Sequence, residues 1–153
     1  MKPQYDSLNG KILECHKHIE KIFVARKNLN SLFPLKMEKY QALDAVAESF
    51  IDQLVFRFLK LQDTMGEGIF PRVLSLVLED IKGKTFLDRL NRLEELDLVD
   101  KNQWLELREL RNEIAHEYSD NQEEIMEALN AIFDQSVILV DIFKKIEMFV
   151  SKQ

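Results

Sequence analysis

The sequence predicts an all-α fold: an up-and-down four-helix bundle with one or two extra short helices, formed by a single domain over residues 1–153. A chain of 153 residues suits one compact domain better than two. It contains only four Gly and three Pro, too few for a β-sandwich with many turns. Apolar residues make up 46% of the chain and recur at the three-, four- and seven-residue spacing of helices.

Two long helices are predicted first, over residues 5–32 and 35–65. Pro34 separates them, because proline interrupts helical hydrogen bonding. Gly66 and Gly68 predict the end of the second helix. The apolar positions of the first helix are Ile12, Ile19, Ile22, Phe23 and Leu29. Those of the second are Leu43, Val46, Ala47, Phe50, Leu54, Phe58 and Leu61.

Short helices are predicted in the middle of the chain. Pro71 can open one that continues through Ile81, and Gly83 closes it. Thr85 can cap another, which ends before an extended segment at 96–99. The apolar residues of this second short helix are Phe86, Leu87, Leu90 and Leu93.

Two capping boxes begin the last two helices. Asp100 with Gln103 predicts a helix that reaches Tyr118, and Asp120 with Glu123 predicts a final helix that ends near residue 150. The apolar face of the final helix includes Ile125, Leu129, Ile132, Phe133, Val140, Phe143 and Phe149.

The helix predicted over 101–118 has three different faces. Its core stripe consists of Trp104, Leu107, Leu110 and Ile114. Its solvated acidic face consists of Glu106, Glu109, Glu113 and Glu117. Asn112 and His116, four residues apart, share a third face. Arg111 lies at the margin of the core stripe, so we expect a carboxylate, phosphate or interface partner for its charge.

The segment 107–118 reads LRELRNEIAHEY, in which Arg111 and a polar residue are followed by three residues and His116. This pattern resembles the signature of HEPN (higher eukaryotes and prokaryotes nucleotide-binding) domains. Tyr118, two residues after the histidine, is similar to the tyrosine that marks the HepT-like toxin branch. The helical layout, with Trp104 in the approach to the motif, looks like that family over most of the chain. The resemblance therefore implies an HEPN-like fold.

The resemblance further implies a metal-independent endoribonuclease that needs no cofactor. His116 would take the proton from a ribose 2′-hydroxyl, because imidazole is the side chain best suited to proton transfer near neutral pH. Arg111 would bind the phosphate oxygens as charge accumulates there. Asn112 would orient the imidazole or hold a phosphate oxygen. Arg108 is a candidate phosphate-binding residue.

Two kinds of partner follow from the motif. Arg111 and His116 point about 140° apart on an ideal helix, so one protomer does not easily aim both at one phosphate. A homodimer that pairs two motif helices would solve this, and the family is typically dimeric. In the HepT-like branch a minimal nucleotidyltransferase antitoxin transfers AMP to the tyrosine that corresponds to Tyr118. RNA would be the substrate.

The charge distribution keeps two other functions open. The chain has a formal charge of −6, and segment 93–134 holds thirteen Asp or Glu against three Lys or Arg, a net of −10. RNA must approach this acidic segment, which favours a catalytically silent HEPN subunit that binds substrate or nucleotide for a nucleotidyltransferase. A plain helical interaction module with a basic partner is the third possibility.

The remaining conspicuous residues have ordinary interpretations. A single Cys15, expected to be buried, excludes an internal disulfide framework and favours the cytoplasm. His16 and His18 cannot form an i,i+4 metal pair, and we expect both at the surface. The phenylalanines at helical spacing are expected in the core or a dimer surface. No run of about 18 apolar residues predicts a membrane span.

Overall fold

The computed structural model describes residues 3–77, 79–115 and 121–153. These residues form helices and contain no strand, so the predicted all-α class is confirmed. The helices are α1 (Pro3–Leu29), α2 (Met37–Gln41), α3 (Ala45–Asp63), the π-helix η1 (Thr64–Ile69), α4 (Phe70–Leu76), α5 (Phe86–Glu95), α6 (Lys101–Ala115) and α7 (Gln122–Ser151).

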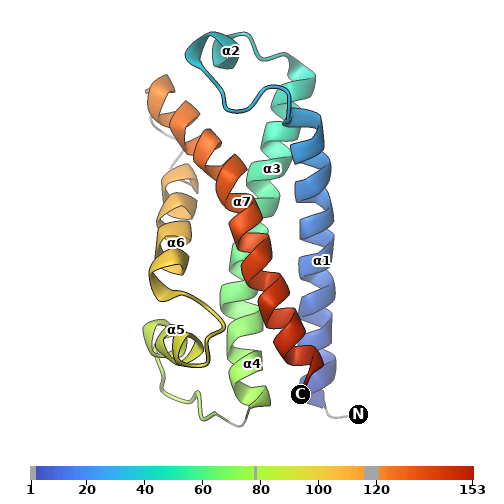
Figure 1. The fold of residues 1–153 in the computed structure, drawn as a ribbon, viewed down its shortest axis with the longest axis vertical. Coiled ribbons are helices and arrows are strands. Elements are labelled where there is room, and N and C mark those ends of the chain that lie inside the picture. Colours follow the sequence, from blue (N-terminus) through green and yellow to red (C-terminus); the bar gives the residue numbers. More distant parts are fainter. Residues whose placement is uncertain (1–2, 78, 116–120) are drawn as a thin grey trace.

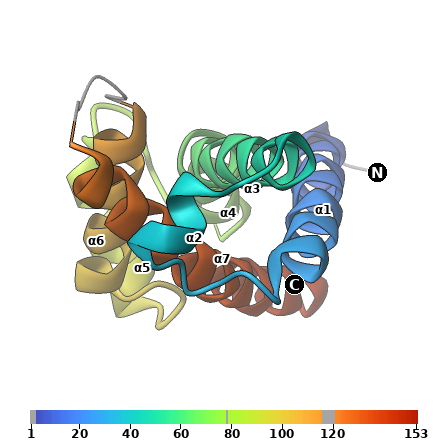
Figure 2. The same ribbon diagram turned by 90° about the horizontal axis from the view of Figure 1, so that it is seen from above.

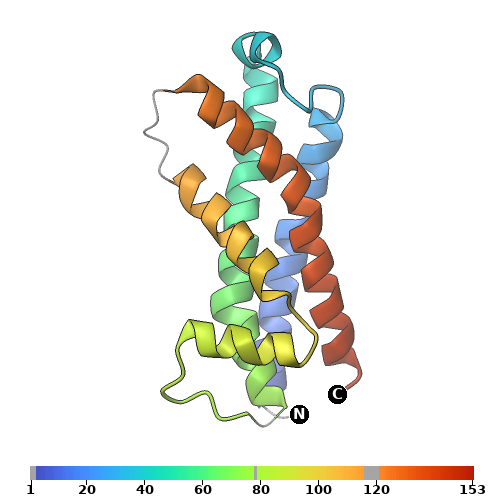
Figure 3. The ribbon, with the colours of Figure 1, turned by 60° about the vertical axis from the view of Figure 1, so that its left-hand side comes forward.

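The long helices run along the long axis of the molecule. The helices α3, η1 and α4 follow one another as a nearly continuous rod that packs along α1, and α7 packs on both α1 and α3 (Figure 1). Seen from above, α5 and α6 lie on one side of the molecule and α1 on the other (Figure 2). The short α5 crosses the end of this rod near α4 (Figure 3). This arrangement places α6 against α7 and α3.

The core is a contiguous cluster of apolar side chains drawn from all the long helices. On α1 a strict seven-residue repeat is fully buried, which is the spacing of a narrow helix-packing stripe. Its members are Leu8, Cys15, Ile22 and Leu29. On α7 ten residues are buried, among them Ile132, Leu139 and Phe143. Cys15 is thus buried, as expected.

The boundaries of the first two predicted helices are wrong. The first helix ends at Leu29 rather than residue 32, and the segment 35–65 does not form one helix. Asp44 begins α3 by accepting a hydrogen bond from the Ala47 amide at 2.8 Å. This cap lies inside the predicted helix and divides it into α2 and α3, because an N-cap residue has non-helical backbone angles.

Gly66 and Gly68 do not end the helix that precedes them, contrary to prediction. Both are buried within η1, which leads directly into α4. A Cβ atom on Gly66 would lie 3.4 Å from Cζ2 of Trp104. At that distance a Cβ would make only ordinary van der Waals contact. A Cβ on Gly68 would lie 3.0 Å from Cδ of Lys11, so close packing against α1 applies to Gly68 and not to Gly66.

The short helices agree with prediction in position, and only the first differs in length. The helix at Pro71 ends at Leu76 instead of Ile81, and Gly83, at φ +71°, lies in the turn before α5. Thr85 caps α5 with the predicted side chain, in a capping box with Asp88.

The final two helices begin near the predicted residues. Asp100 accepts a hydrogen bond from the Gln103 amide at 2.9 Å, as its capping role requires. For α7 the cap is Asn121, which accepts from the amides of Glu123 and Glu124. Asp120, the predicted cap, lies outside the described residues.

Candidate functional site

The motif helix α6 presents the faces that its sequence predicts. Trp104, Leu107 and Leu110 are buried, and Ile114 is partly buried. The Trp104 ring packs on Phe70 with 4.6 Å between ring centroids. The glutamates of the acidic face that the structure describes are exposed, namely Glu106, Glu109 and Glu113. Glu117 lies outside the described residues.

Arg111 forms a two-pronged ion pair with Asp63, the last residue of α3. Its Nε donates to Oδ1 at 3.1 Å and its Nη2 donates to Oδ2 at 3.0 Å. The two side chains are 32% and 36% exposed, so the pair lies at the edge of the core within reach of solvent. The hydrogen bonds to Asp63 raise the pKa of Arg111, against a smaller opposing effect of burial. The predicted need for a partner is confirmed, and the partner is a carboxylate.

Gln62 holds the same part of α6 from inside the core. Its side chain is 4% exposed, and Nε2 donates to the carbonyl of Leu107 at 2.9 Å. Leu107 and Arg111 are one helical turn apart, so Gln62 and Asp63 together hold one turn of α6. The orientation of Arg111 is therefore set by α3 and not by α6 alone.

A rare element of secondary structure follows directly after this pair. The π-helix η1 begins at Thr64, next to Asp63, and Glu67 within it adds an electrostatic contribution that also raises the pKa of Arg111. Short π-helical segments inside helices are uncommon and occur frequently at functional sites. No feature of the sequence signals a π-helix here, other than the two glycines that we interpreted as a helix end.

The other described motif residues point to different surroundings. Asn112 is exposed. Arg108 is exposed, and its guanidinium carbon lies 4.7 Å from the centre of the Phe86 ring of α5. Arg108 and Arg111 thus contact different neighbouring helices, α5 and α3.

His116 and Tyr118 lie outside the described residues. The structure therefore brings together Arg111 and Asp63, and it gives no distance from Arg111 to the predicted general base. The roles of Arg111, Asn112 and His116 in catalysis, and of Tyr118 as an AMP acceptor, stay predictions.

The sequence did not predict a buried polar contact that joins α1 to α3. His18, expected at the surface, is only 7% exposed, and its Nδ1 lies 3.0 Å from Nη1 of Arg57. Because an arginine can only donate, Nδ1 is the acceptor and the proton of a neutral ring sits on Nε2. Burial and the nearby Arg57 charge lower the pKa of His18. The helical spacing from Cys15 to His18 and on to Ile22 is the signal that could have placed His18 inside.

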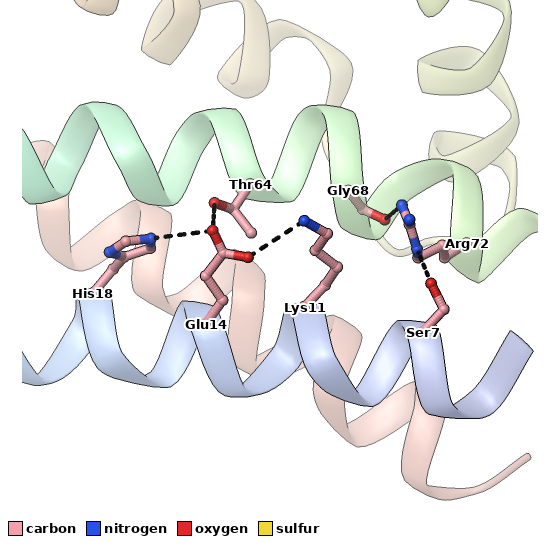
Figure 4. Close-up of polar contacts among 7 residues, drawn as sticks. All are labelled: Ser7, Lys11, Glu14, His18, Thr64, Gly68 and Arg72. Carbon is pink, nitrogen blue, oxygen red and sulfur yellow. Dashed lines mark hydrogen bonds and ion pairs between the residues drawn. The ribbon is translucent and has the colours of Figure 1, made fainter. Parts of the chain in front are cut away.

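The same interface carries a row of polar contacts (Figure 4). Glu14 of α1 lies between Lys11 and His18, with an oxygen 3.4 Å from Nζ of Lys11 and the other 3.9 Å from Nε2 of His18. Arg72 of α4 donates to Ser7 at 2.7 Å and to the carbonyl of Gly68 at 3.0 Å. The two Glu14 ion pairs lie within α1. The bond from Arg72 to Ser7, and one from the Thr64 hydroxyl of η1 to Glu14 at 3.4 Å, tie α1 to the rod formed by α3, η1 and α4. His16, as expected, is exposed, and it pairs with Glu147 of α7.

An open groove of about 1260 Å³ lies at the other end of α6 from α5. Residues from α2, α3, α6 and α7 line it, including Leu110 and Ile114 from the core stripe of α6. Phe56, which the sequence analysis assigned to the core or a dimer surface, is 50% exposed in this groove.

Two classes of feature are not found in the described part of the chain. No group of three or more His, Cys, Asp or Glu side chains is arranged to hold a metal ion. No helix there combines the length and apolar character needed to cross a bilayer.

Comparisons of the chain with protein-family models, with curated proteins and with solved structures give no match. The likeness to HEPN domains therefore rests on the motif at residues 107–118.

Proposed function

We propose that this chain is an HEPN-type four-helix bundle whose homodimer cleaves RNA without a metal ion. Arg111, Asn112 and His116 are the proposed active-site residues. The observation that supports this best is the fixed guanidinium of Arg111, held by two hydrogen bonds to Asp63 beside a π-helix. A positioned guanidinium stabilises developing negative charge without reorganisation during the reaction.

The pairing with Asp63 is compatible with phosphate binding. It uses Nε and Nη2, and Nη1 has no hydrogen-bond partner among the described residues. The Arg111 side chain keeps 32% of its surface exposed. A phosphate oxygen can therefore accept from Nη1 while Asp63 continues to orient the guanidinium.

In the proposed reaction His116 removes the proton from the ribose 2′-hydroxyl, and the freed oxygen attacks the adjacent phosphorus. A 2′,3′-cyclic phosphate forms as the P–O5′ bond breaks. The 5′-oxygen leaves and takes up a proton from water, and His116 returns its own proton to solvent. Arg111 neutralises the charge that gathers on the phosphate oxygens. Asn112, which is exposed beside Arg111, orients the imidazole or holds a phosphate oxygen. Residues from two copies of α6 complete each site across a two-fold axis, because the Arg–His spacing directs the two side chains apart on one helix.

The experiment compares cleavage of a labelled single-stranded RNA by the wild-type protein, His116→Ala and Arg111→Ala in the presence of EDTA. Loss of the general base or of the electrostatic stabilisation should lower the rate of RNA cleavage by about 100-fold or more in each variant. Lys101→Ala, which removes a cation at the start of the same helix, is the matched control, and a substrate with 2′-deoxy sugars must resist cleavage. Circular dichroism and sedimentation verify fold and assembly. Equal activity in either active-site variant would rule out the nuclease.

The proposal includes a nucleotidyltransferase antitoxin that transfers AMP to Tyr118. A bulky, charged nucleotide close in sequence to His116 would block the site and compete for Arg111. Mass spectrometry of the protein co-expressed with a nucleotidyltransferase encoded next to it tests this step. An unmodified Tyr118 peptide contradicts it, and growth arrest on expression alone that His116→Ala relieves supports the toxin role.

One observation favours a second candidate, a catalytically silent binding subunit. Arg111 already has a carboxylate partner within its own chain, so its charge is satisfied without any phosphate. In this case the pair serves only to hold α6 on α3. Binding of ATP in calorimetry, together with no RNA cleavage by the wild-type protein, would identify this function.

A further inference from the structure

The groove at the α2 end of the molecule is too large and open for a typical small-molecule site. Its volume of about 1260 Å³ exceeds the roughly 300–1000 Å³ of small-molecule pockets. Residues of α2, α3, α6 and α7 line it. At this end of the molecule the first turns of α7 diverge from α3 toward α6 (Figures 1 and 3). The size and shape of the groove suit a segment of polypeptide.

The described residues that line the groove combine an apolar surface with one sign of charge. The apolar lining includes Leu43, Ile51, Val55, Phe56, Leu59, Leu110, Ile114, Ile125, Ala128 and Ala131. The charged lining residues are all acidic, namely Glu48, Asp52, Glu113, Glu124 and Glu127. No Lys, Arg or His is among the described lining residues. We call these five carboxylates the acidic rim.

The acidic rim belongs to separate helices on facing walls. Glu48 and Asp52 are one turn apart on α3, Glu113 is on α6, and Glu124 and Glu127 are on α7. Charges of one sign around an apolar surface reinforce one another and attract the opposite charge. Two cations of α3, Arg57 and Lys60, lie 5.3 and 5.6 Å from the centre of the Phe56 ring. Neither lines the groove, and Arg57 reaches His18 of α1.

An aromatic side chain in the groove is left open to solvent. Phe56 is 50% exposed, although Phe58 on the same helix is fully buried. Partly exposed aromatic residues in grooves are the usual anchors of protein interfaces. The groove therefore offers both apolar contact area and charge to a partner.

We propose that this groove docks a basic amphipathic helix of a partner protein. The apolar face of such a helix, with side chains at i, i+3, i+4 and i+7, would cover Phe56 and the apolar lining. Its Lys and Arg side chains would reach the acidic rim on both walls. This surface is independent of the nuclease proposal, because none of Arg111, Asn112 or His116 is needed for it.

The chemistry of the groove disfavours a nucleic acid as its occupant. Nucleic-acid binding depends on Lys and Arg side chains that neutralise phosphates, whereas the charged lining here is acidic. A phosphate backbone would be repelled by the carboxylates on either wall. RNA that reaches Arg111 must approach it from outside the groove.

The test measures binding of synthetic fluorescent 18-residue peptides by anisotropy at low salt. The first peptide is built from Leu and Lys, with leucines at i, i+3, i+4 and i+7 and lysines on the opposite face. A second peptide has the same composition in scrambled order, and a third has Glu in place of Lys. We expect the first to bind at least about tenfold tighter than the other two, with affinity that falls as salt is added.

The acidic rim is tested with a triple variant, Glu48→Gln, Asp52→Asn and Glu127→Gln. The matched control is Glu20→Gln, Glu106→Gln and Asp141→Asn, which removes three exposed carboxylates that do not line the groove. We expect the rim variant to lose about tenfold in affinity for the Leu/Lys peptide, since each peripheral ion pair contributes little on its own. The control should change affinity less than about threefold.

Several results would overturn the proposal. Equal losses in the rim and control variants would mean that net charge alone attracts the peptide. Equal binding of the scrambled peptide, or no binding of any peptide, would exclude a helix-docking groove. A labelled RNA that displaces the peptide would identify the groove as a nucleic-acid site. Conversion of a homodimer to a monomer by the rim variant, seen in sedimentation, would assign the groove to a second copy of this chain.

Discussion

Gln62 donates a hydrogen bond from Nε2 to the main-chain carbonyl of Leu107 at 2.9 Å, 45 residues further along the chain. The contact is buried and joins α3 to the motif helix α6. Asp63, the next residue, holds Arg111 at the following turn of α6. The position of the candidate site therefore depends on two consecutive polar residues of α3.

Replacing Gln62 by Met is expected to lower the free energy of unfolding by about 1 kcal/mol. The substitution keeps the buried volume and removes one hydrogen bond, and a typical net contribution of such a bond is about 1 kcal/mol. Urea denaturation measures the change. The control Gln41→Met removes an exposed hydrogen bond, from Nε2 of Gln41 to Oε1 of Gln122, and should cost less than about 0.5 kcal/mol because water can replace it. An unchanged unfolding midpoint in Gln62→Met would show that the contact does not hold α6.

The ion pair between Arg111 and Asp63 is expected to show a coupling energy of about 0.5–1 kcal/mol in a double-mutant cycle. About a third of each side chain is exposed, so solvent screens the two charges and keeps the coupling energy small. The two-pronged geometry places the coupling energy toward the upper end of this range. The cycle uses Arg111→Met, Asp63→Asn and the double variant, measured by urea denaturation. The coupling should weaken in 1 M salt. Additive effects of the two substitutions would contradict a working ion pair.

The helical class, and the faces of α6, could be predicted from the sequence because both depend on local periodicity. Trp104, Leu107 and Leu110 are buried because a helix places side chains three and four residues apart on one face. The need for a partner at Arg111 followed from the cost of burying a lone charge. That the partner is Asp63 did not follow, because the pairing joins helices whose packing is set by tertiary contacts.

The main errors in the predicted structure concern residue types that commonly occur in two different structural roles. Gly66 and Gly68 often indicate a helix end, yet here both are buried within η1, and Gly68 packs closely against the Lys11 side chain of α1. His18 was expected at the surface together with His16, although Arg57 gives it a buried partner. Asp44 was overlooked as a helix cap inside an apolar pattern that seemed continuous. The glycine and histidine cases are decided by contacts between helices, and the Asp44 case by a local hydrogen bond to the Ala47 amide. Periodicity describes neither kind of contact.

His18 predicts a pH dependence of stability. Burial, and then the charge of Arg57, lower the pKa of His18 in the folded protein below its usual 6.5, with smaller effects from Lys60 and Lys17 and an opposing one from Glu14. The unfolded chain therefore binds more protons as the pH falls below about 6.5. The stability that neutral, buried His18 contributes is therefore complete above a pH of about 6.5. It is lost as the pH falls toward the lowered pKa of His18 in the folded protein.

The measurement is urea denaturation of the wild type and of His18→Asn at pH 7.5, 6.5, 5.5 and 5.0. The Asn side chain keeps an oxygen acceptor near the position of Nδ1, so it can still accept from Arg57, but it does not titrate. The variant should lose less stability than the wild type between pH 7.5 and 5.0. Parallel stability curves for the two proteins would contradict the assignment of this titration to His18.

Cys15 is expected to be unreactive in the folded protein. Its side chain is fully buried, and burial, together with the charge of Glu14, raises the pKa of the thiol from 9.0 to about 12. The thiolate is the nucleophile, so a rise of this size reduces the reactive fraction about a thousandfold at a given pH below both values. A disulfide reagent such as Ellman's reagent at pH 8 should react slowly with the native protein and rapidly in 6 M urea. Cys15→Ser provides the blank under both conditions. Rapid labelling of the native protein would mean that α1 separates from its neighbours readily, because the thiol lies in the seven-residue stripe of α1 that packs in the core.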